Sequence, residues 1–377
     1  MKRPLPATAG DQRDRGQSRR HFLRNLGIAA AGTTLLAHGP AERSAPEKPS
    51  ADPEPRDRPG AELWQPAYLK LEAEGKFEQR VEQAYEHLEH CELCPRRCRV
   101  NRLAGQIGAC NAPEQAVVYS AQPHYGEELP LVGHNGSGTI FFSNCNLRCV
   151  FCQNWPIAHE GRGRRVADET LADVMLQLQG IGCHNINVVT PSHVMPNILA
   201  AVRIAAGKGL RIPLVYNTGG YDALEAIKLL DGVVDIYLPD LKFTDGVEAE
   251  RYTGSTQDYP RVAKAAIEEM YRQVGNLQTD RQGIALRGVM IRHLVMPNRI
   301  AGTREFVNWV AESLSPDTYV NIMSQYRVEH RAFEHPKIAR AITTQEYLEA
   351  MEWAEEAGLR NLDERSVMQK EVFRRRG

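Results

Sequence analysis

The sequence predicts an α/β fold in which helices cover a parallel sheet. From residue 139 onward, six short β-rich runs alternate with six longer stretches of helical periodicity. Strict alternation of this kind requires parallel strands joined by helical crossovers. The 377 residues leave room for an α/β barrel, and both a barrel and an open doubly wound sheet satisfy the pattern.

The composition is that of an ordinary soluble globular protein. Hydrophobic residues make up 42% of the chain and charged residues 25%. The formal net charge is -1, so the chain as a whole has no field that would attract nucleic acid. We therefore expect no nucleic-acid partner.

The first 41 residues have the features of a twin-arginine export signal. Arg19 and Arg20 precede Phe22 and Leu23, and a short, moderately apolar run follows over 26–36. An ordinary basic amphipathic N-terminus is the alternative. Residues 42–60 are rich in Pro, Glu, Asp and Arg and poor in large apolar side chains, which predicts a disordered linker.

Residues 61–135 are expected to form an N-terminal extension. Over 63–89, apolar residues recur at near-helical spacing among many Glu and Lys, which predicts one helix. Four cysteines follow in the order Cys91-x2-Cys94-Pro-x2-Cys98-x11-Cys110. Four thiolates this close together indicate a metal centre, either tetrahedral zinc or an iron–sulfur cluster. In an exported chain, two disulfides are the alternative.

Residues 136–377 contain the predicted sheet and a C-terminal helix. Strands are predicted over 139–143, 185–190, 213–216, 233–238, 288–295 and 319–323. Helices are predicted over 169–179, 196–207, 221–230, 261–274, 303–313 and 344–357. In parallel α/β folds, chemistry collects at the carboxyl ends of the strands, which directs attention to the residues that follow each strand.

A cysteine motif directly after the first of these strands is the most specific chemical feature. Cys145, Cys149 and Cys152 have the spacing CxxxCxxC, and Phe151 precedes the last of them. Three thiolates can hold a four-iron cubane and leave one iron open to a ligand that is not protein. A zinc knuckle would want a fourth ligand close by, and three cysteines in eight residues are too dense for chance burial.

The motif, its spacing and the strand before it resemble the radical S-adenosylmethionine (SAM) superfamily. From about residue 91 to the C-terminal helix, the chain is similar to uncharacterised homologues of pyruvate formate-lyase-activating enzyme. The resemblance implies an incomplete (β/α)6 barrel, a [4Fe-4S] cluster on the three cysteines, and SAM bound to its open iron. It also implies a low-potential electron donor of the flavodoxin or ferredoxin type.

The resemblance extends to residues near the strand ends. In glycyl-radical activases, polar residues after the third, fourth and fifth strands line the SAM site. Asn217, Asp240, Lys242 and Arg292 occupy the matching positions, and Phe151 is a candidate to contact the adenine. Taken singly, polar residues at strand ends are also common as helix caps and turns.

The sequence departs from the family after the second strand. Many members have Gly-Gly-Glu there for the SAM amino group, whereas this chain has Thr190-Pro191-Ser192-His193. The hydroxyls or His193 are candidates to replace that contact, and a structural histidine is the alternative. Candidates for substrate contacts follow the sixth strand, namely Asn321, Ser324, Gln325 and Tyr326.

These features predict a radical SAM enzyme that reductively cleaves SAM and abstracts hydrogen from a protein glycine or a small molecule. The alternative is an exported iron–sulfur electron-transfer or metal-binding protein without SAM turnover. A third hypothesis is a zinc-stabilised binding module. The signal segment favours export, whereas the supply of SAM and reductant favours the cytoplasm, so the sequence leaves the compartment open.

Overall fold

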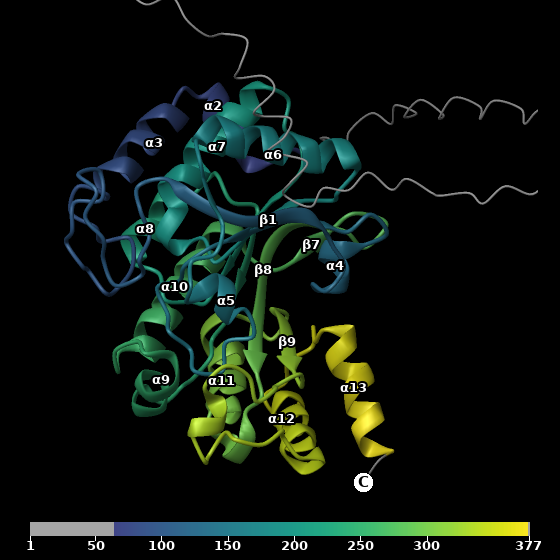
Figure 1. Cartoon of the computed structure of the whole chain (residues 1–377). Coiled ribbons are helices and arrows are strands. Elements are labelled where there is room, and N and C mark those ends of the chain that lie inside the picture. The colour runs from purple at the N-terminus through teal and green to yellow at the C-terminus, as the bar shows by residue number, and fades with distance from the viewer. Residues whose placement is uncertain (1–63, 376–377) are drawn as a thin grey trace, which may run out of the picture.

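The computed structural model describes residues 64–375, so the predicted signal segment and linker lie outside the described residues. Nine strands form one sheet in this part of the chain (Figure 1). The strands are β1 (Ala116–His124), β2 (Ser137–Phe142), β3 (Arg164–Val166), β4 (Ile186–Val189), β5 (Leu214–Thr218), β6 (Ile236–Pro239), β7 (Gln278–Thr279), β8 (Ala285–Leu294) and β9 (Tyr319–Met323).

The α-helices lie mainly between these strands and after the last one. They are α2 (Ala67–Ala73), α3 (Phe77–Glu86), α4 (Leu129–Val132), α5 (Trp155–Ala158), α6 (Asp168–Ile181), α7 (Met195–Gly207), α8 (Leu224–Leu229), α9 (Gly246–Thr253), α10 (Tyr259–Val274), α11 (Thr303–Trp309), α12 (Thr344–Glu356) and α13 (Glu364–Arg374). Within residues 64–375, none of them combines the length and apolar character needed to cross a bilayer.

The sheet is mixed, with a parallel centre and antiparallel additions. The six predicted strands correspond to β2, β4, β5, β6, β8 and β9, which pair in parallel in that order. The additions are β1 on β2, β3 on β1, and β7 on β8. The predicted parallel sheet is therefore present at the centre, and the sequence pattern did not predict the antiparallel strands β1, β3 and β7. The description as an incomplete (β/α)6 barrel stays a prediction.

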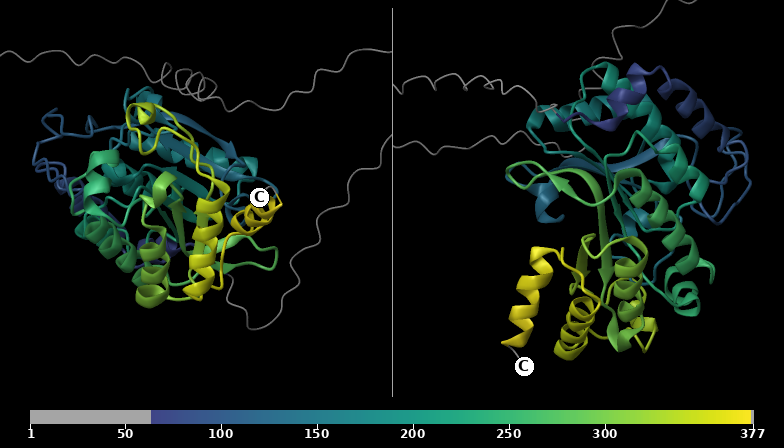
Figure 2. Two further views of the ribbon diagram at one scale, coloured as in Figure 1. Left: turned by 90° about the horizontal axis from the view of Figure 1, so that it is seen from below. Right: turned by 180° about the vertical axis from the view of Figure 1, so that it is seen from behind.

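The helices pack against one another largely in chain order. Contacts run from α6 to α7, from α8 to α10, and from α11 through α12 to α13. Views from below and behind show α13 beside the end of the sheet that carries β9 (Figure 2). Helices α2 and α3 both pack on α7. They replace the single helix expected over 63–89, since Gly75 between them has a φ of +68° that cannot continue a helix.

Alternation along the parallel strands separates two apolar clusters. Tyr216, Tyr237 and Ile291 belong to the large cluster that includes the helix side chains. Their neighbours Val215, Ile236 and Met290 belong to a small cluster with Leu131 and Tyr319. Successive side chains of a strand point to opposite faces, so these two clusters mark the helix-covered face and the inner face of the sheet.

The same alternation places polar residues on the inner face. Asn217 lies two positions after Val215, Arg292 two after Met290, and Asn321 two after Tyr319. Asp240 follows Leu238 in the same way and forms an isolated parallel bridge with Arg292. The carboxyl ends of β5, β6, β8 and β9 thus hold a polar layer above a small apolar one.

Candidate functional site

The centre of the polar layer is a carboxylate held between two cations. Asp240 Oδ1 accepts a hydrogen bond from Arg292 Nε at 2.7 Å, and Oδ2 lies 2.6 Å from Lys242 Nζ. All three side chains are largely buried. Burial would raise the pKa of Asp240, but Arg292 and Lys242 together hold it below its usual value. Burial acts to lower the pKa of Lys242 and of Arg292, but the neighbouring Asp240 acts against it. Both cations therefore have a pKa above the usual value.

Asn217 completes this network on the neighbouring strand. Its Oδ1 accepts from Arg292 Nη2 at 2.6 Å. The structure therefore brings together Asn217, Asp240, Lys242 and Arg292, although β5, β6 and β8 are far apart in the sequence. Their role in holding SAM stays a prediction.

Phe151 faces the same network across a small cavity. This cavity, of about 50 Å³, is lined by Phe151, Asp240, Lys242, Leu294, Met296 and Met323. The Phe151 ring is buried, and its centroid lies 6.1 Å from that of Phe243 and 6.2 Å from that of Tyr326. An apolar ring beside buried charges is the arrangement expected for a ligand that carries both a flat apolar part and polar groups.

The cysteine motif forms the loop between β2 and α5. Backbone hydrogen bonds from Arg148 N to Thr253 O (2.7 Å) and from Val150 N to Tyr252 O (2.9 Å) fix this loop to the end of α9. Leu147 N donates to Cys145 Sγ at 3.3 Å. Phe151 of this loop lines one cavity together with Asp240 and Lys242, so the loop adjoins the Asp240 network.

Burial is the largest influence on these thiols. It raises the pKa of Cys145 to about 11 and also raises the pKa of Cys149 and Cys152, while the nearby Lys242 acts in the opposite direction. None of the three is in a disulfide. A bare thiolate is therefore disfavoured here, and a bound metal centre would remove that penalty.

The second group of cysteines lies in the segment between α3 and β1. Burial raises the pKa of Cys94 to about 12, and Cys110, Cys91 and Cys98 act on it in the same direction. The four thiols are thus near neighbours, but they do not converge on one point. They are free thiols, and Ala109 N donates to Cys98 Sγ at 3.4 Å. The two disulfides considered above are absent from the described residues.

Arginine side chains attach this four-cysteine segment to the loop of Cys145, Cys149 and Cys152. Arg96 Nε donates to Asn146 O at 2.5 Å, and its Nη2 donates to Gly254 O. From the other side, Arg148 Nη2 donates to Ala109 O at 3.1 Å. Ala109 directly precedes Cys110, and Arg148 directly precedes Cys149. The hydrogen bond from Arg148 to Ala109 therefore links the two sets of cysteines.

Arg102 makes a further connection that sequence reasoning missed. It is 1% exposed and donates to His193 O at 2.7 Å and to Pro113 O. His193 in turn holds Ser143 O through its Nε2 at 2.8 Å, two residues before Cys145. A lone arginine in a loop offers no sequence pattern from which such contacts to distant main-chain carbonyls could be found.

The residues that stand where the family has Gly-Gly-Glu are engaged in structural contacts. Burial lowers the pKa of His193 to about 3, so its ring is neutral while it binds Ser143 O. Ser192 Oγ lies 3.3 Å from Thr218 Oγ1, and Thr218 itself donates to Asp222. These contacts favour the structural interpretation of His193.

The candidates for substrate contacts divide into two groups. Asn321, Ser324 and Gln325 line a second cavity that also contains Glu127 and Arg292. Tyr326 does not line it, and its hydroxyl donates to Ile338 O at 2.6 Å. Glu127 and Glu128 are further residues of this cavity that sequence reasoning missed, because the strand before them was not recognised.

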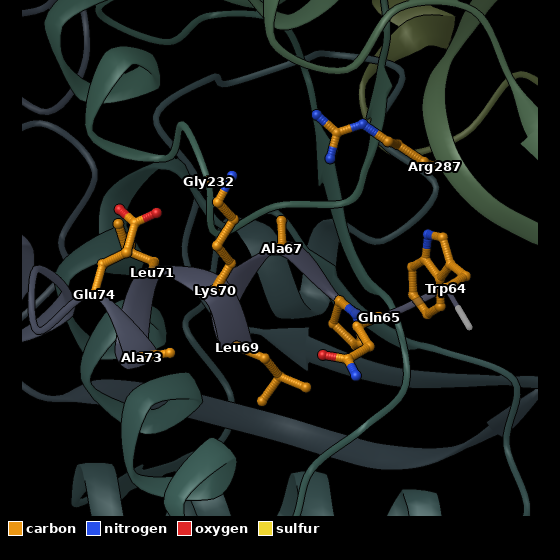
Figure 3. Close-up of a pocket in the computed structure, with 11 residues that line it drawn as sticks. Trp64, Gln65, Ala67, Leu69, Lys70, Leu71, Ala73, Glu74, Gly232 and Arg287 are labelled. Atoms are coloured by element: carbon orange, nitrogen blue, oxygen red, sulfur yellow. The ribbon is translucent and has the colours of Figure 1, made fainter. Parts of the chain in front are cut away.

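A hollow larger than these two cavities lies elsewhere. It measures about 930 Å³ and is bordered by Lys70 of α2 and by Glu74 directly after that helix, together with Gly232 and Arg287 (Figure 3). Arg287 lies near the start of β8, and Gly232 precedes β6. These are the amino ends of the strands, opposite to the edge at which α/β folds place their chemistry, so we do not assign the site there.

Comparison with known proteins identifies the family. The model of the radical SAM superfamily matches residues 139–277. The uncharacterized protein MJ0674 of Methanocaldococcus jannaschii is 33% identical over 288 residues, which make up 74% of this chain and 78% of that protein. The chain belongs to the radical SAM superfamily. A solved structure of TYW1 with a lysine-pyruvate adduct bound aligns with 58% of this chain and 73% of its own, at 10% identity and a TM-score of 0.36.

Membership of the radical SAM superfamily implies a [4Fe-4S] cluster and SAM, and the donors present suit the cluster. The three motif thiols are soft ligands of the kind that hold iron–sulfur centres, and they are free. Among residues 64–375, no three His, Cys, Asp or Glu side chains already converge on a point from which they could hold a metal ion. Binding would therefore require the thiols to turn toward a common centre.

Gly220 allows the loop after β5 to lie close to the main chain of Asp240 in the radical SAM site. It has a φ of +77°, and a Cβ atom there would lie 2.4 Å from Asp240 O. We expect Gly220→Ala to lower the free energy of unfolding by more than about 3 kcal/mol, because backbone strain adds to a collision with main chain. Gly358→Ala is the matched control, since Gly358 also has a φ of +77° but no atom within 4 Å. Equal losses of unfolding free energy for the two variants in urea would show that the backbone moves to avoid the contact with Asp240 O.

Arg102 should be important for attaching the four-cysteine segment to the radical SAM domain. We expect Arg102→Met to cost about 2–4 kcal/mol, because the buried carbonyl of His193 and the partly buried carbonyl of Pro113 lose their donor. Arg99 lies in the same segment, with its side chain 70% exposed and paired with Glu92, so Arg99→Met should cost under about 0.5 kcal/mol. Urea unfolding of the purified proteins measures both. A loss for Arg102→Met no larger than that of Arg99→Met would contradict the assignment.

Proposed function

We propose that this radical SAM enzyme reductively cleaves SAM and abstracts a hydrogen atom from a substrate, in a reaction like that of the glycyl-radical activases. The single observation that carries the proposal is the placement of the three motif cysteines beside the Asp240 network and the cavity under Phe151. A metal-bound sulfonium cofactor needs these three elements together: thiolate ligands, charged partners and an apolar surface.

The residues of this site have separate roles in the proposal. Lys242 and Arg292 are suited to bind the carboxylate of SAM through charge-assisted hydrogen bonds. Asp240 is suited to accept from the amino group or the ribose, and it keeps both cations oriented. Phe151 excludes water from the adenine side. When bound, the reduced cluster supplies the electron that breaks the sulfonium bond and so generates a 5'-deoxyadenosyl radical.

The test is the formation of 5'-deoxyadenosine. Protein reconstituted with iron and sulfide under anaerobic conditions is given SAM and dithionite, and the nucleoside is quantified by mass spectrometry. The expected result is formation above a control without protein. Its absence, with the iron and sulfide fully incorporated, would refute SAM cleavage. In the cell, a flavodoxin- or ferredoxin-type protein is proposed to replace dithionite.

One observation favours an alternative in which SAM is not turned over. Ser192 and His193, which stand where many family members contact the SAM amino group, are occupied by internal hydrogen bonds. An exported iron–sulfur electron carrier would retain the cluster and show no affinity for SAM. Equilibrium dialysis with radiolabelled SAM separates the two functions, because only the enzyme should retain the label.

We propose in addition that Cys91, Cys94, Cys98 and Cys110 hold a second metal centre, zinc or iron–sulfur. The mutual influence of the four thiols and their attachment through Arg96 and Arg148 support this. Measurement of iron, zinc and sulfide identifies the metal. About eight irons per chain would indicate two cubanes, about four with one zinc would indicate a structural staple, and four without zinc would contradict the second centre.

A further inference from the structure

The second cavity is lined by Arg292 but not by Lys242. Its volume is about 100 Å³, and its lining includes Glu127 and Glu128 from the loop after β1, Asn321 from β9 and Arg365 from α13. The cavity therefore lies between the beginning and the end of the sheet, where the described chain contributes two adjacent buried carboxyl groups.

The two carboxyl groups have too few cationic partners. Glu127 Oε2 lies 3.4 Å from Arg292 Nη1, whereas Asp240 engages the same guanidinium at 2.7 Å. No basic side chain among residues 64–375 forms an ion pair with Glu128. Arg365, the other cation at the cavity, donates through Nη1 to Gly126 O at 2.9 Å. Burial raises the pKa of Glu127 and Glu128 more than Arg292 lowers it.

Buried hydrogen-bonding groups at this cavity are also unpartnered. Glu128 is 3% exposed, and while its Oε1 accepts from Asn321 Nδ2 at 2.9 Å, its Oε2 has no partner. Behind the lining, Asn187 of β4 is fully buried and lowers the pKa of Glu127, and neither its Oδ1 nor its Nδ2 has a partner of hydrogen-bonding geometry. Leaving such a group unpaired costs about 1–3 kcal/mol, so the unpartnered oxygen points to a ligand that donates.

We propose that Glu127 and Glu128 bind an ammonium group of the substrate, so that the substrate of this radical SAM enzyme carries a primary amine. The inference rests on the proposed function and deepens it by naming the substrate class. The local cations do not favour an anionic substrate in addition to SAM. Arg292 is engaged by Asp240 and Asn217 and is assigned to the carboxylate of SAM, and Arg365 donates to a carbonyl. The cavity has more hydrogen-bond acceptors than donors, because the carboxyl groups of Glu127 and Glu128 have too few partners. An ammonium group supplies three N–H donors and a positive charge.

The test uses ethylammonium chloride as a fragment of such a substrate. Reconstituted protein is titrated with ethylammonium chloride, and sodium chloride keeps the ionic strength constant. Ethanol and sodium acetate are titrated in parallel, and each series is measured without SAM and with saturating SAM. Ethylammonium should raise Tm by about 2 °C at ten times its Kd, and the two other compounds should not. Glu128→Gln should weaken ethylammonium binding by tenfold or more. Glu371→Gln, an exposed change on α13, should leave it unchanged.

Each other outcome overturns the proposal. An equal response to ethanol would indicate a neutral donor, and a response to acetate alone would indicate an anionic substrate. Loss of the ethylammonium response on adding SAM would assign the site to the amino group of SAM. No response in the wild-type protein, or an undiminished one in Glu128→Gln, would remove the site altogether. If Glu128→Gln does not fold, Glu127→Gln serves for the same comparison.

The titration measures binding and requires no turnover. Failure of the wild-type protein to form 5'-deoxyadenosine would refute the proposed function. The ethylammonium titration would still show whether Glu127 and Glu128 bind an ammonium group. Conversely, SAM cleavage without an ethylammonium response would keep the enzyme and remove the amine substrate.

Discussion

Replacing Cys149 with alanine is expected to abolish 5'-deoxyadenosine formation. Cys149 is the central residue of the CxxxCxxC motif, and it is buried beside Lys242. Two remaining thiols cannot hold a cubane that already leaves one iron without a protein ligand. The effect should therefore be a loss to background, together with a loss of about four irons per chain.

Cys183→Ala is the matched control for this change. Cys183 is also buried and free, but it lies apart from both cysteine sets, between α6 and β4. It should retain the iron content and the activity, at the small cost in stability that a truncated buried side chain brings. Activity of Cys149→Ala comparable to that of Cys183→Ala would show that the cluster is held elsewhere.

Asp240→Ala is expected to destabilise the protein by about 3–5 kcal/mol and to remove SAM binding. The change leaves Lys242 and Arg292 as two neighbouring buried cations without their shared carboxylate, which is the costly way to break a buried ion pair. Because the pKa of Asp240 is lowered in the folded protein, its contribution is present above the usual carboxyl pKa and is lost as the pH falls below about 4.

The control for Asp240→Ala is an ion pair of similar length at the surface. Asp317 accepts from Arg360 at 2.7 Å and 2.6 Å, but the two side chains are 54% and 65% exposed. Asp317→Ala should cost under about 1 kcal/mol. Urea unfolding and SAM dialysis are measured on both variants. If Asp240→Ala unfolds like Asp317→Ala and still binds SAM, the network has neither of the roles assigned to it.

The central strands and the network at their ends could be predicted because both follow from local patterns. The β-rich runs located six parallel strands, and the rule that chemistry collects at their carboxyl ends directed attention to Asn217, Asp240 and Arg292. The family resemblance singled out the same residues, but the sequence does not show that a single guanidinium joins Asp240 to Asn217.

The remainder depended on contacts that are distant in the chain. Strand β1 contains Ser120, Gln122 and Pro123 and has no apolar alternation, so the position of Glu127 and Glu128 could not be foreseen. The helix expected over 221–230 is shortened to α8, since Tyr221 and Asp222 are held in a loop by Thr256 and Thr218. Such hydrogen bonds override helical propensity.

In the hydrogen bonds that Arg96, Arg102 and Arg148 donate around the four-cysteine segment, the acceptors are peptide carbonyls: those of Asn146, Gly254, Ala109, His193 and Pro113. A carbonyl oxygen is supplied by every amino acid, so substitutions at the accepting positions should be tolerated wherever the backbone keeps its path. Replacements of Arg96, Arg102 or Arg148 remove the donor itself. A saturation-mutagenesis screen for cluster retention should therefore be strict at the three arginines and permissive at Ala109, which is exposed.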